Sequence, residues 1–206
     1  MSLRKSLLLV FLILLVDQVS KIYVKTHFVL GESVDVFNWF KILFIENEGA
    51  AWGVKLSDFF PITNKTGKLI LTVFRVFAVA GIGYWLLDTI KRNSPKTLIF
   101  AVCLIFAGAV GNILDSVFYG MLFDESAYRG SVATLFSNDS YGSIFHGKVV
   151  DMLHFPMINT TWPTWVPYFG GQSFSFFEPV FNIADMAIST GVGILLVFNK
   201  KAFGKN

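Results

Sequence analysis

The stretch that decides the fold is residues 97–115, TLIFAVCLIFAGAVGNILD. No charged side chain interrupts it before its last residue, Asp115. A helix needs about 20 predominantly apolar residues to cross the hydrocarbon of a membrane. The stretch therefore predicts a membrane-spanning helix that ends on an acid.

The composition of the whole chain agrees with a membrane protein. Its 206 residues are 54% hydrophobic and 15% charged, with a mean hydropathy of +0.60. A soluble domain carries about a quarter charged residues, so this chain lacks the polar surface to face water all round. The length fits a single domain, residues 1–206. The basic residues are not clustered as in a nucleic-acid-binding protein, so no nucleic-acid partner is expected.

Four apolar runs approach the length of a membrane span, at about 6–24, 68–87, 97–114 and 181–198. The first run follows Arg4 and Lys5 and could be mistaken for a cleavable secretory signal. It is long, however, contains Asp17 and Lys21, and lacks a small-x-small cleavage site. We therefore interpret it as a retained first span.

Basic residues beside the spans indicate the orientation. They fall before the first span, between the second and third, and after the fourth, as Arg4, Lys5, Lys91, Arg92, Lys96, Lys200, Lys201 and Lys205. Cytoplasmic loops carry an excess of Lys and Arg. Both termini are therefore expected on the cytoplasmic side, which leaves segments 25–67 and 115–180 on the outer side of the membrane.

The two outer segments differ in character. Residues 33–37 and 41–45 alternate or run apolar between Gly31 and Gly49, which predicts two short strands. Segment 162–177 is rich in Trp, Phe, Gly and Pro, and Trp and Tyr favour the membrane interface. The predicted fold class is thus membrane α-helical, with four transmembrane helices, a small periplasmic β-rich segment and an aromatic-rich outer loop.

Charges inside spans are costly and mark candidate functional residues. Asp17 and Lys21 stand four residues apart and can pair on one helix face, which would make them a structural ion pair. Arg75 in the second span could pair internally or bind an anionic head group. A small transporter or lipid-binding protein that uses these three residues as a polar pathway is the non-enzymatic alternative.

Three further acids, Asp115, Asp151 and Asp185, are predicted at the outer edge of the membrane in apolar sequence without bases nearby. When two carboxylates share a site, one pKa rises strongly, so that one acid is protonated while the other is ionised. An aspartic protease requires this state. The three histidines show no HExxH spacing and there is no GxSxG, so neither a metal nor a cofactor is expected.

Five blocks together resemble the motifs of the lipoprotein signal peptidase family, in the same order along nearly the whole chain. They are Asp17-Gln18-Val19-Ser20-Lys21, Asn47-Glu48-Gly49-Ala50-Ala51-Trp52-Gly53, Gly108-Ala109-Val110-Gly111-Asn112-Ile113-Leu114-Asp115, Val149-Val150-Asp151 and Phe181-Asn182-Ile183-Ala184-Asp185. The resemblance implies an aspartate membrane endopeptidase with its site at the outer leaflet. It also implies a prolipoprotein substrate whose Cys carries diacylglycerol, with cleavage immediately before that Cys.

The resemblance also implies residue roles. Asp151 and Asp185 would be the catalytic pair, and the supporting or substrate-binding set would be Asp17, Lys21, Asn47, Gly49, Asn112, Asp115, Asn182 and Ala184. Membrane lipid and cyclic lipopeptide inhibitors are further expected partners. The order of motifs leaves open a pairing of Asp115 with Asp185, with Asp151 structural.

The chain departs from the family pattern in four places. Ser116 stands where the family usually has Arg, and Ala109 replaces a Gly. Additional residues at about 121–147 and 156–178 lengthen the outer loops. We interpret the two additions as a lid or interfacial platform over the site, with simple occupation of the periplasm as the alternative.

Overall fold

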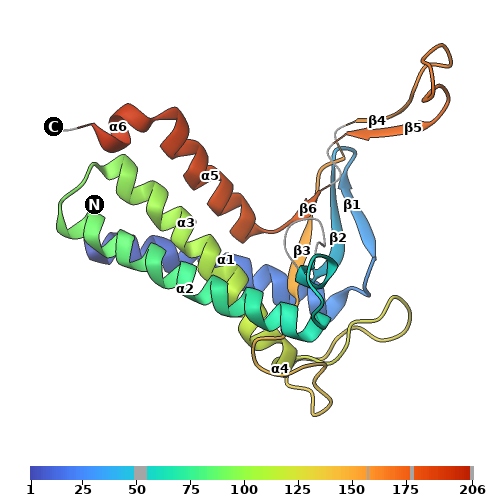
Figure 1. Cartoon of the computed structure of the whole chain (residues 1–206), viewed down its shortest axis with the longest axis horizontal. Helices are drawn as coiled ribbons and strands as arrows, with labels where there is room; N and C mark the ends of the chain where they lie inside the picture. The colour runs from blue at the N-terminus through green and yellow to red at the C-terminus, as the bar shows by residue number, and fades with distance from the viewer. Residues whose placement is uncertain (49–54, 157, 177–178, 205–206) are drawn as a thin grey trace.

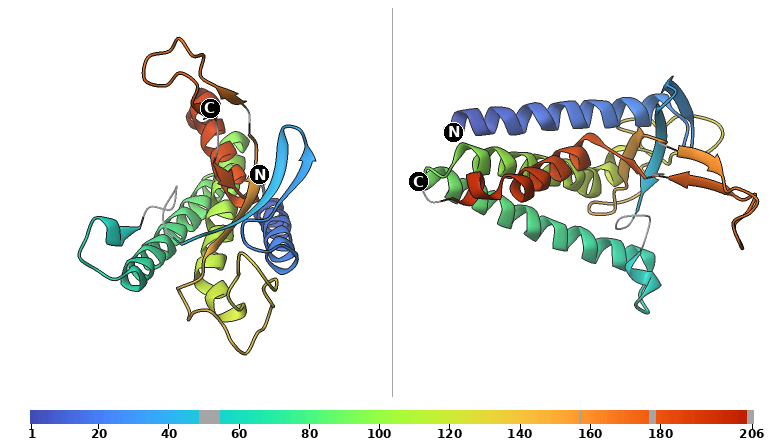
Figure 2. Two further views of the ribbon diagram at one scale, coloured as in Figure 1. Left: turned by 90° about the vertical axis from the view of Figure 1, so that its right-hand side faces the viewer. Right: turned by 90° about the horizontal axis from the view of Figure 1, so that it is seen from above.

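The computed structural model describes residues 1–48, 55–156, 158–176 and 179–204. Helices form one end of the molecule and a β-sheet lies at the other (Figure 1). The N- and C-termini lie together at the helical end, far from the sheet (Figures 1 and 2). This arrangement fits an even number of membrane crossings.

Three of the four predicted spans are helices long and apolar enough to cross a membrane: α1 (Leu3–His27), α2 (Asn64–Lys91) and α3 (Lys96–Leu114), which continues helically to Leu122. The fourth, α5 (Ile183–Val197), is a shorter apolar helix of 15 residues, followed by α6 (Asn199–Phe203). At 1.5 Å per residue, α5 is about 22 Å long. The described residues thus contain three long apolar helices and one shorter one.

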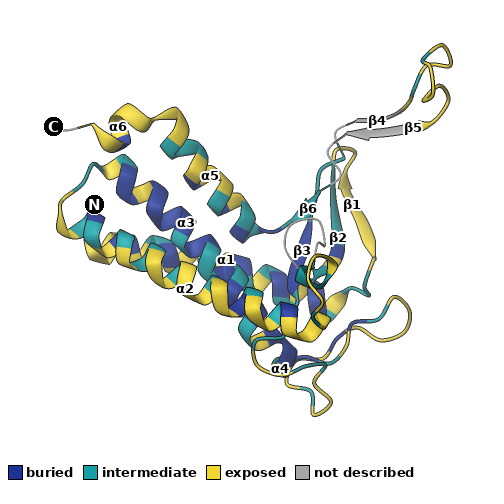
Figure 3. Ribbon diagram, in the orientation of Figure 1, coloured by how far each residue is buried: buried dark blue, intermediate teal, exposed yellow. Residues whose placement is uncertain are grey.

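Helix α3 is the centre of the helical end, because α1, α2 and α5 all pack against it (Figure 2, left). Most of α3 is buried, whereas α2 and the outer face of α1 are largely exposed (Figure 3). The exposed residues of these outer helices include Leu8, Phe11, Phe74 and Phe77. Apolar surface on this scale fits contact with lipid rather than with water.

The sequence predicts that the third span ends at Leu114, but the helix continues beyond this residue. It continues through a π-helical turn, η3 (Asp115–Tyr119), into a short turn, α4 (Gly120–Leu122). Single π-turns inside helices occur frequently at functional sites. Asp115 and Ser116, the first two residues of this turn, are both fully buried.

The main sheet is antiparallel with the strand order β1-β2-β3-β6. Its strands are β1 (Ser33–Phe37), β2 (Phe40–Asn47), β3 (Val149–His154) and β6 (Val180–Phe181). The two predicted strands are thereby confirmed as β1 and β2, while β3 and β6 were not predicted. The fourth apolar run correspondingly begins as helix at Ile183, because Phe181 pairs with Leu153 in the sheet.

Stacked aromatic rings join the far edge of this sheet to β6. Trp39 and Phe40 at the β1–β2 turn stack on Phe155, whose ring centroid lies 5.6 Å from that of Phe181. The aromatic outer loop forms a separate hairpin, β4 (Ile158–Thr161) with β5 (Ser173–Phe176), which extends away from the helices (Figure 1). A lid or platform role for this hairpin stays a prediction.

Candidate active site

One cleft collects residues from the helices and the sheet at the level where the two meet. Its volume is about 570 Å³, and it is lined by Asn47 at the end of β2, Asn112 on α3, Asp151 on β3 and Asp185 on α5. Arg75, from α2, lines it as well. We call it the acid-pair cleft, after Asp151 and Asp185.

The local sequence explains where α5 starts and where Asp185 lies. Asn182 is the N-cap: its side-chain oxygen accepts from the Asp185 N–H at 2.9 Å, and Asp185 accepts in return from the Asn182 N–H at 3.4 Å. This reciprocal capping satisfies two amides of the first turn. It also fixes the half-buried Asp185 carboxylate in the first turn of α5, beside the sheet.

Two asparagine side chains connect the acids. Asn182 Nδ2 donates to Asp151 Oδ1 at 2.7 Å and is 3.1 Å from Asn112 Oδ1. Asn112 Nδ2 donates to Asp185 Oδ1, also at 2.7 Å. The two carboxyl groups are therefore held by one amide chain that bridges α3, β3 and α5.

Burial, together with the negative charge of Asp185, raises the pKa of Asp151 to about 7. Hydrogen bonds from Asn182 and Asn47 and the charge of Lys21 oppose this rise. Asp151 is 6% exposed, so desolvation dominates. Near neutral pH the pair can thus hold one proton, which is the state that general acid–base chemistry on a carbonyl requires.

A buried ion-pair network lies directly beneath the acid pair. Lys21 Nζ is 3.0 Å from Asp17 Oδ2, 2.8 Å from Asp115 Oδ2 and 3.0 Å from Asn112 Oδ1. All three charged side chains are fully buried. The expectation that Asp115 lacks a neutralising base was wrong, because α1 brings Lys21 against the end of α3.

This network separates Asp115 from the acid pair. Besides Lys21, Asp115 accepts from Gln18 Nε2 at 2.9 Å and from the Val150 N–H at 3.3 Å, and it does not line the acid-pair cleft. The pairing of Asp115 with Asp185, which the sequence left open, therefore has no geometric support in the described residues. The predicted pairing of Asp17 with Lys21 is present.

Sequence reasoning missed two polar side chains of the network, Gln18 and Tyr119. Tyr119 donates to Gln18 Oε1 at 3.1 Å, and this orients the Gln18 amide toward Asp115 and Asp17. Gln18 lies within the first motif beside Asp17, which was a usable signal. Tyr119 lies four residues after Asp115, at the end of the π-turn, and the sequence does not show this turn.

Ala184 and the small residues of α3 allow α5 to approach closely. The Ala184 N–H donates to Asp17 Oδ1 at 2.8 Å. A Cβ at Gly111 would lie 2.6 Å from Asp17 Oδ2, and one at Gly108 would lie 2.2 Å from the Ala184 carbonyl oxygen. Both glycines are therefore required by close packing against α1 and α5.

The remaining predicted residues fall as follows. Asn47 Nδ2 lies 3.5 Å from Asp151 Oδ2, at the limit of a hydrogen bond. Gly49 lies outside the described residues. Ser116, at the position of the family's usual Arg, donates to the Asn112 carbonyl at 3.0 Å. Arg75 lines the acid-pair cleft and is attracted by Asp185 and Asp151.

Comparisons with known proteins agree with this geometry. The family model for signal peptidase (SPase) II, peptidase family A8, matches residues 9–200. The lipoprotein signal peptidase of Porphyromonas gingivalis is 47% identical over 192 residues, which cover 92% of this chain and 80% of that protein. That of Amoebophilus asiaticus is 33% identical over 195 residues, 93% of this chain and 75% of that protein.

A solved structure shares the fold. A bacterial membrane enzyme determined by the in meso method at 1.9 Å superposes with a TM-score of 0.60 at 23% identity, covering 96% of this chain and 93% of that one. The solved structure shows a shared fold, whereas the family match over residues 9–200 and the 47% identity to the P. gingivalis protein show membership of the family. This chain belongs to the signal peptidase II family, peptidase family A8.

Proposed function

We propose that this protein is an aspartic endopeptidase that removes the signal peptide from diacylglyceryl-modified prolipoproteins, with Asp151 and Asp185 as its catalytic pair. The observation that carries the proposal is the shared cleft: both acids line it, and Asn182 and Asn112 hold them in one hydrogen-bonded chain. The raised pKa of Asp151, about 7, supports a singly protonated pair at neutral pH.

The proposed reaction follows from that protonation state. The ionised carboxylate takes a proton from a water molecule while the protonated acid hydrogen-bonds to the scissile carbonyl oxygen. Attack of the water oxygen on the carbonyl carbon gives a tetrahedral species. Its collapse breaks the C–N bond, and the leaving amine takes a proton from the pair, which restores the singly protonated state.

The membrane setting supports a lipid-modified substrate. The acid-pair cleft lies where the apolar helices meet the sheet, and Ala78, Val79 and Ile82 of α2 form one of its walls. We propose that α5 and α6 complete a fourth crossing, with both termini in the cytoplasm and the cleft at the outer leaflet of the inner membrane. The diacylglyceryl chains could then stay in lipid while the bond before the modified Cys reaches the acids. Cyclic lipopeptide inhibitors would occupy the same cleft.

The transport alternative is not supported by the arrangement of its proposed pathway. Asp17 and Lys21 are fully buried. They pair with each other, Lys21 also pairs with Asp115, and Asp17 accepts from the Ala184 N–H. Neither residue lines the acid-pair cleft, whereas Arg75 does, so the three residues form no continuous route in the part of the chain that the structure describes.

The test is cleavage of a diacylglyceryl-modified lipobox peptide by the purified full chain in detergent. Asp151→Asn and Asp185→Asn should each abolish cleavage while the folded protein is recovered in normal yield. Asp88→Asn, near the other end of α2, is the matched control and should retain full activity. Cleavage that survives Asp151→Asn would remove that residue from the pair, and wild-type protein that cleaves no lipopeptide would overturn the proposed function.

A further inference from the structure

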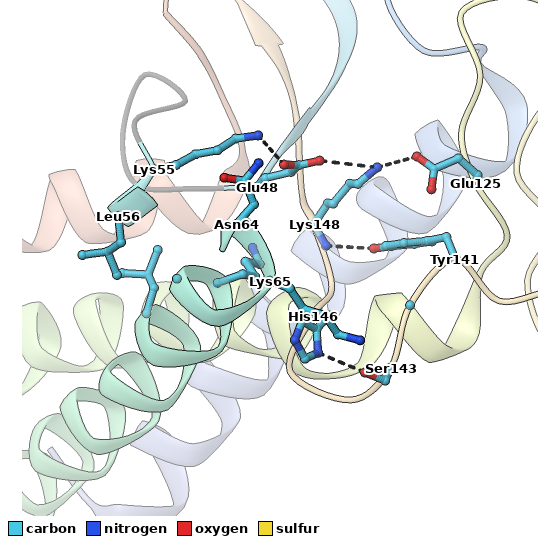
Figure 4. Close-up of a pocket in the computed structure, with 14 residues that line it drawn as sticks. Glu48, Lys55, Leu56, Asn64, Lys65, Glu125, Tyr141, Ser143, His146 and Lys148 are labelled. Atoms are coloured by element: carbon cyan, nitrogen blue, oxygen red, sulfur yellow. Dashed lines mark hydrogen bonds and ion pairs between the residues drawn. The ribbon is translucent and has the colours of Figure 1, made fainter. Parts of the chain in front are cut away.

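A second cavity has a volume of about 410 Å³, and no step of the proposed reaction uses it (Figure 4). Its lining contains four lysines and two glutamates, a formal charge of +2: Lys55, Lys65, Lys68, Lys148, Glu48 and Glu125. We call it the lysine cavity. Tyr141, Ser143 and His146 add polar groups to one wall.

The two glutamates of the lysine cavity are already paired. Lys55 Nζ lies 2.6 Å from Glu48 Oε2, and Lys148 Nζ lies 2.5 Å from Glu125 Oε1 (Figure 4). Lys148 is also 3.3 Å from Glu46, at ion-pair distance without hydrogen-bond geometry. These contacts leave the charges of Lys65 and Lys68 to account for the surplus.

Lys68 is the residue of this cavity that most strongly indicates an anionic ligand. Its Nζ is buried and has no hydrogen-bond partner among the described residues. Leaving a buried ammonium unpaired is costly, and an anion in hydrogen-bond reach relieves that cost. Lys65, which is exposed and lines the same cavity, adds a second positive charge at its entrance.

The lysine cavity and the acid-pair cleft follow one face of α2. Lys68 and Leu71 line the first, and Arg75 and Ala78 line the second. Residues three or four apart share a helix face, and Lys68 to Arg75 spans about 10 Å along the axis. On the sheet side, Lys148 precedes Asp151 by three residues, again about 10 Å in an extended chain.

We propose that the lysine cavity binds an acidic side chain of the substrate, about three residues after the scissile bond. The inference rests on the proposed function, which sends the signal peptide into the membrane and the mature segment outward past the first turns of α2. An extended peptide advances about 3.3 Å per residue, so three residues cover the 10 Å between the two cavities. Asp or Glu there would pair with Lys65 at the entrance, and with Lys68 once its side chain turns the buried Nζ into the cavity.

Helix geometry argues against a phospholipid phosphate as the occupant. The exposed apolar residues at this end of α2 centre on the face opposite Lys68 and Leu71, since each residue turns about 100°; they are Leu69, Ile70, Val73, Phe74, Val76 and Phe77. Acyl chains that pack on that exposed face would leave their headgroup on the far side of the helix. The lysine cavity, by contrast, shares one face of α2 with the acid-pair cleft.

The test uses three diacylglyceryl lipobox peptides that differ only at the third residue after the scissile bond, which is Glu, Gln or Lys. The full chain is assayed in nanodiscs of zwitterionic lipid. We expect wild-type kcat/KM for the Glu peptide to exceed that for the Gln peptide roughly tenfold or more. Lys68→Met should bring this ratio close to one, whereas Lys91→Met, at the exposed end of the same helix, should keep it.

A second variant guards against loss of fold. Lys65→Glu changes an exposed residue and should shift preference from the Glu peptide toward the Lys peptide. Equal cleavage of all three peptides by the wild type, or a ratio unchanged by Lys68→Met, would overturn the proposal and leave the proposed function intact. A ratio of one, combined with Lys68-dependent activation by phosphatidylglycerol, would assign the cavity to lipid. Cleavage of none of the peptides would refute the proposed function itself.

Discussion

The Asn182 side chain donates to Asp151 Oδ1 at 2.7 Å across 31 positions of sequence, while its own oxygen caps the helix that carries Asp185. One residue thus starts α5 and orients the acid on β3. The same amide nitrogen lies within 3.2 Å of the Val150 carbonyl oxygen, so it is fixed on more than one side. The side chain that caps α5 is therefore also the one that orients the Asp151 carboxylate.

Replacing Asn182 separates these two roles. Asn182→Ser keeps a capping oxygen but cannot reach Asp151, so kcat should fall roughly 100-fold with little change in thermal stability. Asn182→Ala should lose similar activity and, in addition, about 1 kcal/mol of stability from the missing cap. Lipopeptide cleavage and thermal unfolding of both variants provide the comparison. Wild-type kcat in Asn182→Ser would show that the bond to Asp151 is dispensable.

The pH dependence of cleavage should report the raised pKa of Asp151. Because that pKa is about 7, the pair keeps its single proton up to neutral pH and loses it above. We expect kcat/KM to decline on an alkaline limb with an apparent pKa near 7 that belongs to the pair. A profile that stays flat from pH 6 to pH 9 would contradict this.

Asp151 should cost stability at neutral pH. The unfolded chain releases this proton near pH 3.9, whereas the folded protein retains it up to about pH 7. Stability therefore falls as the pH rises from about 4 to 7 and does not recover above. Asp151→Asn removes this cost, so it should raise the unfolding temperature more at pH 8 than at pH 5. An equal effect at both values would argue against the pKa shift.

The buried lysine beneath the site should be essential to folding. Lys21→Met leaves Asp17 and Asp115 buried without their cation, which should cost roughly 3–5 kcal/mol. Adding Asp17→Asn and Asp115→Asn should recover much of that loss, because no buried charge then remains. Lys41→Met breaks the exposed pair with Asp35 and should cost less than about 1 kcal/mol. Similar unfolding temperatures for Lys21→Met and Lys41→Met would refute the network's role.

Two glycines on neighbouring helices provide a matched test of close packing. Gly111→Ala would place a methyl group 2.6 Å from Asp17 Oδ2, so we expect lower stability and lower activity. Gly81→Ala on α2 meets nothing within 4 Å and should be neutral or stabilising by up to about 1 kcal/mol. Folded yield and thermal unfolding distinguish them, and an unaffected Gly111→Ala protein would contradict the packing argument.

Much of the architecture could be predicted from the sequence. The length of an apolar run depends only on the residues within it, so the spans that form α1, α2 and α3 could be predicted from the sequence. The alternation in 33–37 likewise predicted β1. The motifs placed Asp151 and Asp185 as candidates, because an acid in apolar sequence is unusual wherever the chain folds.

Only the tertiary structure decided how those residues are used. It paired Lys21 with Asp115, placed Val149–His154 in the sheet as β3, and set Lys68 in a cavity on the same face of α2 as the acid-pair cleft. None of this is visible locally, because the charge state of a carboxylate or an ammonium depends on which distant segments exclude water from it and which ions they bring within 3 Å.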